Sequence, residues 1–177
     1  TTSFSATYYP DGYIYNPIAG NSYKVERIST STGERTKIGV LDGLIGRVTA
    51  KVGTSESRLI TSDGRYIYNV SHHINDGSTT AYNGWTVKVF DPRDDWKVVK
   101  QYIVGNSSFN TNGIISDGIY LYFIEWRVND SARITISRII DGSIVKTYTI
   151  NQGATDAIGG QYDWSNNKIW LGALRNN

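Results

Sequence analysis

Hydrophobic and polar residues alternate one by one along much of the chain. The clearest runs are Trp85-Thr86-Val87-Lys88-Val89-Phe90, Arg133–Ile139 and Ile144–Tyr148. Successive side chains of a β-strand point to opposite faces, so this period of two predicts half-buried strands. No segment shows the period of 3.6 residues that marks an amphipathic helix. The pattern therefore predicts an all-β chain.

One motif recurs: a turn dipeptide followed by a strand of alternating aromatic and aliphatic residues. Its copies are Asp11-Gly12-Tyr13-Ile14-Tyr15, Asp63-Gly64-Arg65-Tyr66-Ile67-Tyr68, Asp117-Gly118-Ile119-Tyr120-Leu121-Tyr122 and the degenerate Ser165-Asn166-Asn167-Lys168-Ile169-Trp170. They lie about fifty residues apart, close to the roughly 40 to 50 residues of known four-stranded repeats. Asp-Gly and Asn-Asn favour the positive φ angles of tight hairpin turns. Because a short apolar run precedes each turn, each copy is predicted to be a hairpin.

A second hairpin follows the first in three of the copies, with turns at 31–33, 91–94 and 141–143. Each of these units then has four strands in meander order. A lone four-stranded sheet cannot bury both of its faces, so such units have to stack on one another. The radial way of stacking them is a β-propeller.

The unit resembles the loose YVTN-type propeller repeats of surface and secreted proteins. The apolar run, the Asp-Gly turn, the Tyr-Ile-Tyr strand and the corners Val89-Phe90-Asp91-Pro92 and Ile139-Ile140-Asp141-Gly142 carry the resemblance. It implies a β-propeller-like array of four-stranded antiparallel blades, although propellers host binders and enzymes alike. The alternative is a β-sandwich or jelly roll, which predicts alternation but no recurrence of one turn at a fixed period.

The repeats predict a single propeller-like domain over 1–177, with blades at about 1–41, 42–104 and 105–150 and a partial blade at 151–177. About three and a half blades do not fill a ring, which usually has four to eight. They leave the strand Lys168-Ile169-Trp170-Leu171 with an exposed edge. We therefore expect a part of a longer protein, or an assembly subunit that a neighbouring chain completes, unless the N-terminal segment supplies the missing strands.

The balance of charges, the apolar runs and the cysteine count bear on which classes of function to expect. With 18 basic and 16 acidic residues, and no basic cluster, the chain gives no sign of binding nucleic acid. No run approaches the roughly 18 apolar residues that span a bilayer, so we expect no membrane insertion. The chain has no cysteine, which excludes disulfides, thiolate metal sites and a cysteine nucleophile.

Few charges and many Tyr, Ser, Thr, Asn and Gly residues resemble the composition of secreted, cell-surface and virion β proteins. We therefore expect an extracellular, cell-surface or virion location. Asn69, Asn106 and Asn129 each begin an Asn-x-Ser sequon that would accept a glycan in a secreted chain.

The predicted topology places the B–C loops within blades and the D–A loops between blades on one face. The second B–C loop, 71–84, is long and holds both histidines of the chain, and long loops on a rigid scaffold often carry function. Aromatic faces beside amides and carboxylates suit a sugar, although such aromatics also fill the wedges between blades. The predicted ligand-binding residues are His72, His73, Asn75, Asp76, Tyr82, Trp85, Trp126, Arg127, Asn129, Asp130, Asn110 and Asp156.

Catalytic and metal-binding patterns are missing from the sequence. His72 and His73 point to opposite faces if they lie on a strand, and His-Glu-x-x-His, Gly-x-Ser-x-Gly and a phosphate-binding loop do not occur. We predict no catalytic residue, no metal and no cofactor. The carboxylates of Asp76, Glu125, Asp130 and Asp156 have no defined pairing for glycoside chemistry.

The leading hypothesis is thus a non-enzymatic recognition or adhesion module that binds a glycan or protein receptor through the B–C/D–A face. One alternative is a carbohydrate-active propeller enzyme, a hydrolase or lyase. A second alternative is a structural subunit that associates with itself or with a larger assembly through its open last blade.

Overall fold

The computed structural model of the chain describes residues 6–18, 24–40, 59–72, 84–105, 110–126, 132–150 and 154–175. Every regular element in these ranges is a β-strand. No helix that is long and apolar enough to cross a membrane occurs in them. The expectation of an all-β chain is confirmed.

The strands form three four-stranded sheets and one two-stranded sheet, each antiparallel and in chain order. Blade one holds β1 (Thr7–Tyr9), β2 (Tyr13–Ile18), β3 (Lys24–Ser29) and β4 (Arg35–Val40); blade two holds β5 (Leu59–Ser62), β6 (Ile67–His72), β7 (Trp85–Asp91) and β8 (Lys97–Val104). Blade three holds β9 (Asn110–Ser116), β10 (Tyr120–Trp126), β11 (Ala132–Arg138) and β12 (Ile144–Ile150), and the fourth hairpin holds β13 (Ala154–Asp163) and β14 (Lys168–Arg175). This is the meander order that the sequence predicts.

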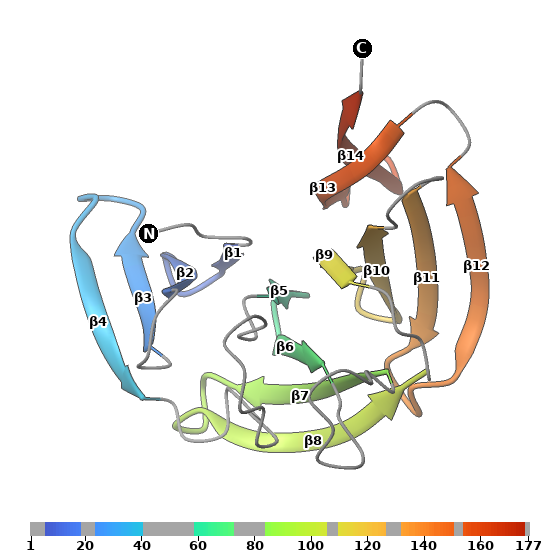
Figure 1. Cartoon of the computed structure of the whole chain (residues 1–177). Coiled ribbons are helices and arrows are strands. Elements are labelled where there is room, and N and C mark those ends of the chain that lie inside the picture. The colour runs from blue at the N-terminus through green and yellow to red at the C-terminus, as the bar shows by residue number, and fades with distance from the viewer. Residues whose placement is uncertain are drawn as a thin grey trace, which may run out of the picture.

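The sheets stand side by side in an arc (Figure 1). The first strand of each unit, β1, β5, β9 or β13, lies near the centre, and β4, β8 and β12 lie on the outside. Blade one and the fourth hairpin form the two ends of the arc.

The hairpin turns have the predicted backbone. Gly12, Gly64 and Gly118 have φ angles of 90°, 85° and 83°, and Asn167 has a φ of 53° in the degenerate copy. This left-handed region is open to glycine and tolerated by asparagine, so the Asp-Gly and Asn-Asn dipeptides determine where each hairpin reverses.

One predicted strand begins later than expected. After the turn predicted at 91–94, the alternating pattern predicts a strand that starts at Trp96, but β8 begins at Lys97 and Trp96 lies in the turn with a φ of 59°. Its ring packs edge-on against Tyr15 of blade one, with ring centroids 4.9 Å apart. The packing of a large aromatic ring between blades therefore outweighs the strand preference of tryptophan.

The hydrophobic core lies between the units. One cluster joins Tyr9, Tyr15 and Val25 of blade one to Ile60, Ile67 and Phe90 of blade two. A larger cluster joins blades two and three, and a small one joins blade three to the fourth hairpin. Strand β7 is therefore buried on both faces, whereas its alternation predicts burial on one, because a blade lies on either side of it.

Candidate functional site

The carboxylate of the recurring Asp-Gly turn fixes the turn and the next strand. Asp63 Oδ1 accepts hydrogen bonds from the backbone N–H groups of Arg65 and Tyr66 at 2.8 and 2.7 Å. Its Oδ2 accepts the hydroxyl of Tyr68 at 2.6 Å. Asp117 makes the same three bonds, the last to the hydroxyl of Tyr122 at 2.6 Å. The Asp-Gly motif therefore has a structural role: it holds the hairpin turn and the tyrosine of the next strand.

The other two units keep this pairing at a different spacing. Asp11 Oδ2 accepts the hydroxyl of Tyr15 at 2.5 Å, and Asp163 Oδ2 accepts the indole N–H of Trp170 at 3.4 Å. Burial and the hydrogen bond to the aspartate raise the pKa of Tyr15, as they do for the tyrosines of blades two and three. Each of these three phenols thus stays protonated, and able to donate, well above neutral pH.

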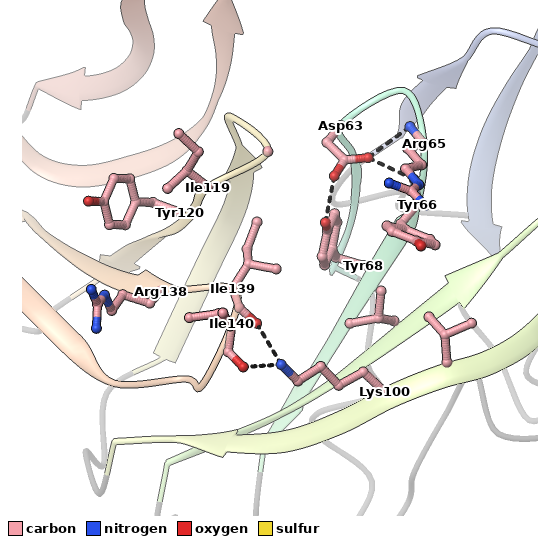
Figure 2. A pocket seen from close by; sticks show the side chains of 13 residues that line it. Asp63, Arg65, Tyr66, Tyr68, Lys100, Ile119, Tyr120, Arg138, Ile139 and Ile140 are labelled. Atoms are coloured by element: carbon pink, nitrogen blue, oxygen red, sulfur yellow. Dashed lines mark hydrogen bonds between the residues drawn. The ribbon is translucent and has the colours of Figure 1, made fainter.

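A groove of about 600 Å³ opens between blades two and three (Figure 2). The turns between the first and second strands of both blades contribute to it, together with the last turn of blade three and part of β7 and β8. Its lining residues are Asp63, Arg65, Tyr66, Tyr68, Val89, Val99, Lys100, Gly118, Ile119, Tyr120, Arg138, Ile139 and Ile140. The groove therefore lies at the end of the blades opposite to the predicted B–C/D–A face.

Two guanidinium groups lie over one tyrosine ring at this groove. Arg65 lies 4.9 Å and Arg93 5.8 Å from the centroid of Tyr66. Arg93 is also bound to Asp91, with Nε–Oδ1 and Nη2–Oδ2 distances of 2.9 Å, and this pairing lowers the pKa of Asp91. Arg65 is exposed and makes no ion pair with any described residue. Its charge is consequently the one most open to a ligand.

The other cations hold the last turn of blade three in place. Lys100 donates from Nζ to the backbone oxygens of Ile139, at 3.4 Å, and Ile140 (Figure 2). Arg138 lies 3.6 Å from Asp141. Hydrogen bonds from Ser143, with Arg138 and Lys100 nearby, lower the pKa of Asp141, so this carboxylate is ionised and offsets part of the positive charge.

Apolar side chains flank the charged part of the groove. Ile119 is 66% exposed, Ile140 72% and Val99 46%. Water solvates the exposed aliphatic side chains poorly and the guanidinium of Arg65 well, so the groove offers a partner both an apolar and a charged contact. Such a surface is suited to recognition.

No protein-family model matches the chain, and no curated protein matches it. The chain is similar to hydrazine synthase of Kuenenia stuttgartiensis, with 16% identity and a TM-score of 0.59 over 95% of this chain and 42% of that one. It is also similar to the Dos1 propeller, at 12% identity and a TM-score of 0.48 over 92% and 40% of the two chains. Hsv2 of Kluyveromyces lactis has 10% identity and a TM-score of 0.49 over 92% and 56%.

The fold is a β-propeller. Four-stranded meander sheets arranged around a centre, and the likeness to a solved chain over nearly the whole length, both support this conclusion. The chain spans between 40% and 56% of the lengths of these solved chains. At these identities the likeness concerns the fold alone.

Most of the predicted ligand-binding residues lie outside the described residues. They are His73, Asn75, Asp76, Tyr82, Arg127, Asn129 and Asp130. The backbones of His72, Asn110, Trp126 and Asp156 lie in β6, β9, β10 and β13, and their side chains are not described. Asn110 and Trp126 are register partners in the sheet of blade three. The predicted face thus stays a prediction.

Trp85 is the predicted ligand-binding residue whose side chain is described. It is 1% exposed, and its ring stacks on Phe123 of the next blade with centroids 4.8 Å apart. The ring fills the wedge between blades two and three, which is the alternative interpretation of the aromatic residues. This burial corrects the assignment of Trp85 to the ligand-binding face.

Two further polar residues have structural partners. Glu125, which was considered for glycoside chemistry, is fully buried, and Arg133 Nη2 and Thr135 Oγ1 donate to its carboxylate at 2.8 and 2.7 Å. Asn69 is 2% exposed and donates from Nδ2 to the backbone oxygen of Leu59 at 3.1 Å. A glycan on Asn69 would be incompatible with the folded chain. No three His, Asp or Glu side chains within the described ranges gather to hold a metal ion.

Sequence reasoning did not find the groove. Its distinctive residues are Arg65, Ile119 and the dipeptide Ile139-Ile140. One signal was available: the residue after Asp-Gly differs between copies, being arginine in blade two and isoleucine in blade three. Positions that vary within a repeat are the ones that the shared fold leaves free for function.

Proposed function

We propose that this propeller is a non-enzymatic recognition module of a secreted, cell-surface or virion protein, and that its groove between blades two and three binds a protein receptor. One observation carries the proposal: Arg65 lies within 4 Å of no carboxylate in the described part of the chain, although its charge helps to lower the pKa of Asp91, and it shares its groove with the exposed Ile119 and Ile140. A receptor segment with an acidic side chain beside apolar ones complements both features.

The chemistry of the groove favours a protein over a glycan. A sugar stacks on an open aromatic face, but the ring of Tyr66 has Arg65 and Arg93 over it. Exposed aliphatic side chains bind apolar side chains of a partner and offer nothing to hydroxyl groups. Glycan recognition through the B–C/D–A face stays a separate prediction.

The carboxylate in the groove supports a binding role over a catalytic one. A general base needs an ionised oxygen that is free to take a proton from substrate. Both oxygens of Asp63 already accept hydrogen bonds from its own turn and from Tyr68. Three of its roughly four acceptor sites are thus occupied within the fold.

A random peptide library displayed on phage and selected on the immobilised chain tests the proposal. We expect enriched peptides to place Asp or Glu beside Leu, Ile or Phe. The double variant Arg65→Ser/Ile140→Ser should weaken such a peptide at least about tenfold in calorimetry, as removal of central contacts does. The control Arg35→Ser/Val145→Ser changes the side chains 68% and 53% exposed on β4 and β12 and should bind normally.

Two results would overturn the assignment of the groove. One is a set of selected peptides without acidic residues whose affinity the groove variant leaves unchanged. The other is glycan-array binding that is lost in His73→Ala, Tyr82→Ala or Trp126→Ala and kept in the groove variant. That second result would place recognition on the B–C/D–A face.

A further inference from the structure

A second cavity adjoins the groove at the Asp-Gly turns of blades two and three. Asp63 lines both of them: it shares the groove with Arg65 and Ile119, and it shares a cavity at the centre of the arc with Trp164. A Cβ placed on Gly118 would lie 3.9 Å from the Cβ of Asp63. The two turns therefore stand side by side where the groove and the central cavity meet, and we call this meeting point of Asp63 and Gly118 the saddle.

The saddle carries little that would stop a ligand from crossing it. Gly118 and the neighbouring Gly64 have no side chain, because their φ angles of 83° and 85° favour glycine. The carboxylate of Asp63 is directed into its own hairpin, where it accepts hydrogen bonds from two backbone N–H groups and from Tyr68. A ligand that lies in the groove can therefore extend over the saddle into the central cavity.

Strand β9 gives the central cavity a wall that suits an extended polypeptide. Gly113 and Ile115 of this strand line the cavity, and β10 is its one neighbour among the described strands of its sheet. An edge strand presents backbone N–H and C=O groups that its own sheet does not use. An extended peptide pairs with such groups through its own backbone. The cavity beyond the saddle thus offers a polypeptide contacts that do not depend on its sequence.

Trp164 supplies an aromatic contact on the cavity side of the saddle. Its ring is 57% exposed, and the ring of Tyr162 packs edge-on against it with centroids 4.9 Å apart. Its Cη2 lies 3.9 Å from where a Cβ on Gly118 would stand, so the ring leans toward blade three and borders the saddle. A ring that a neighbour holds in place offers a large contact area at a low cost in conformational entropy. Trp164 is therefore suited to bind an apolar side chain of a partner.

We propose that the receptor segment is an extended chain that runs from the groove, over the saddle, into the central cavity. Its acidic side chain meets Arg65, an aliphatic side chain meets Ile119 and Ile140, and a further apolar or aromatic side chain meets Trp164. This occupant presupposes the recognition role proposed for the groove, and it adds the conformation of the partner and the path that the partner takes. The surface of a folded partner could rest on the turns, but it could not reach into the central cavity.

Calorimetry with the most enriched peptide of the phage selection is the first test. Trp164→Ser should weaken this peptide at least about tenfold, as loss of an aromatic anchor does. Removing residues from one end of the peptide should cost the wild type the same factor and cost Trp164→Ser nothing further, because both changes remove one contact. The control Tyr148→Ser changes an exposed ring on β12 that lines neither the groove nor the central cavity, and it should bind normally.

The failure of this path can be told from the failure of the groove. A peptide that Arg65→Ser/Ile140→Ser weakens and Trp164→Ser does not would overturn the path over the saddle and keep the groove as the site. A peptide that neither variant weakens would overturn both proposals. A selection that enriches no linear peptide would overturn the extended segment and leave a folded partner as the occupant of the groove.

Photo-crosslinking on the unmodified chain locates the two ends of the same peptide without any substitution that could disturb the fold. A benzophenone at one end should mark the tryptic fragment 139–146, which holds Ile140 of the groove. A benzophenone at the other end should mark fragment 147–168, which holds Trp164 of the central cavity. Marking of fragment 139–146 from both ends would mean that the peptide lies compactly in the groove, and would overturn the extended path.

Discussion

At the scale of single residues, the turn aspartates stabilise both the hairpin turn and the aromatic residue of the following strand. Asp63 accepts two backbone N–H groups and one buried phenol, all at 2.8 Å or less. Hydrogen bonds to a charged acceptor contribute about 1.5 to 3 kcal/mol, more than neutral ones. One side chain thus stabilises both a turn and the boundary between two blades.

Replacing Asp63 with alanine should lower the free energy of unfolding by about 2 kcal/mol, because the phenol of Tyr68 is left buried without an acceptor. Urea denaturation measures the change. Asp94→Ala is the matched control: the side chain of Asp94 is exposed, and among the described residues its one ion pair is with Lys97, at 3.7 Å, so the loss should stay within about 0.5 kcal/mol. Equal losses in the two variants would contradict the structural role of the motif.

The tyrosine partners predict how stability depends on pH. In the folded chain the pKa values of Tyr68 and Tyr122 lie above the ordinary 10.0, because burial disfavours the phenolate. A pKa raised by folding gives stability that is fully present below the unfolded value and lost as pH rises through the folded one. Melting temperatures should therefore hold to about pH 10 and fall above it.

The double variant Tyr68→Phe/Tyr122→Phe isolates this effect. It should be less stable than wild type at neutral pH, because the aspartates lose their phenol donors. Its melting temperature should fall less steeply between about pH 10 and about pH 12. Parallel curves for the variant and the wild type would show that other groups cause the alkaline loss.

At the scale of elements, the blades are held by close backbone approach as well as by side chains. Gly84 precedes β7 with a φ of 105°, and a Cβ placed on it would lie 2.2 Å from the backbone oxygen of Gly105. Any side chain there would force the start of β7 away from the end of β8. By contrast, Gly33 has a φ of 71° with nothing within 4 Å of such a Cβ.

These two glycines make a paired prediction. Gly33→Ala should cost about 1 kcal/mol, the conformational penalty of a positive φ alone. Gly84→Ala should cost at least about 3 kcal/mol, because steric overlap with the backbone adds to that penalty. Thermal unfolding of the two variants measures the difference. Similar midpoints would mean that β7 and β8 separate without strain at that end.

The sequence predicts elements well where local chemistry decides them. Alternation and Asp-Gly turns place the hairpins, since each depends on residues within a few positions. Trp96 and strand β7 depart from expectation because a neighbouring blade decides their environment. A period of two cannot show that both faces of a strand will be covered, as this depends on what stacks against it.

At the scale of the whole molecule, the groove and the open arc depend on how blades are placed around the centre. The groove brings Asp63 and Arg65 of one blade beside Ile139 and Ile140 of the next, residues far apart in the chain. No spacing rule in the sequence joins them. The order of the four units could be predicted, because each begins with a copy of the same turn motif and the described sheets follow one another in chain order.

The pairing of a turn aspartate with a ring donor also bears on how relatives of this chain are found. The donor follows its aspartate by four residues in blade one, by five in blades two and three, and by seven in the fourth hairpin. A comparison that aligns columns treats these as three different motifs. A search that scores the carboxylate and its donor together, with the spacing left free, would recognise all four pairs as copies of one motif.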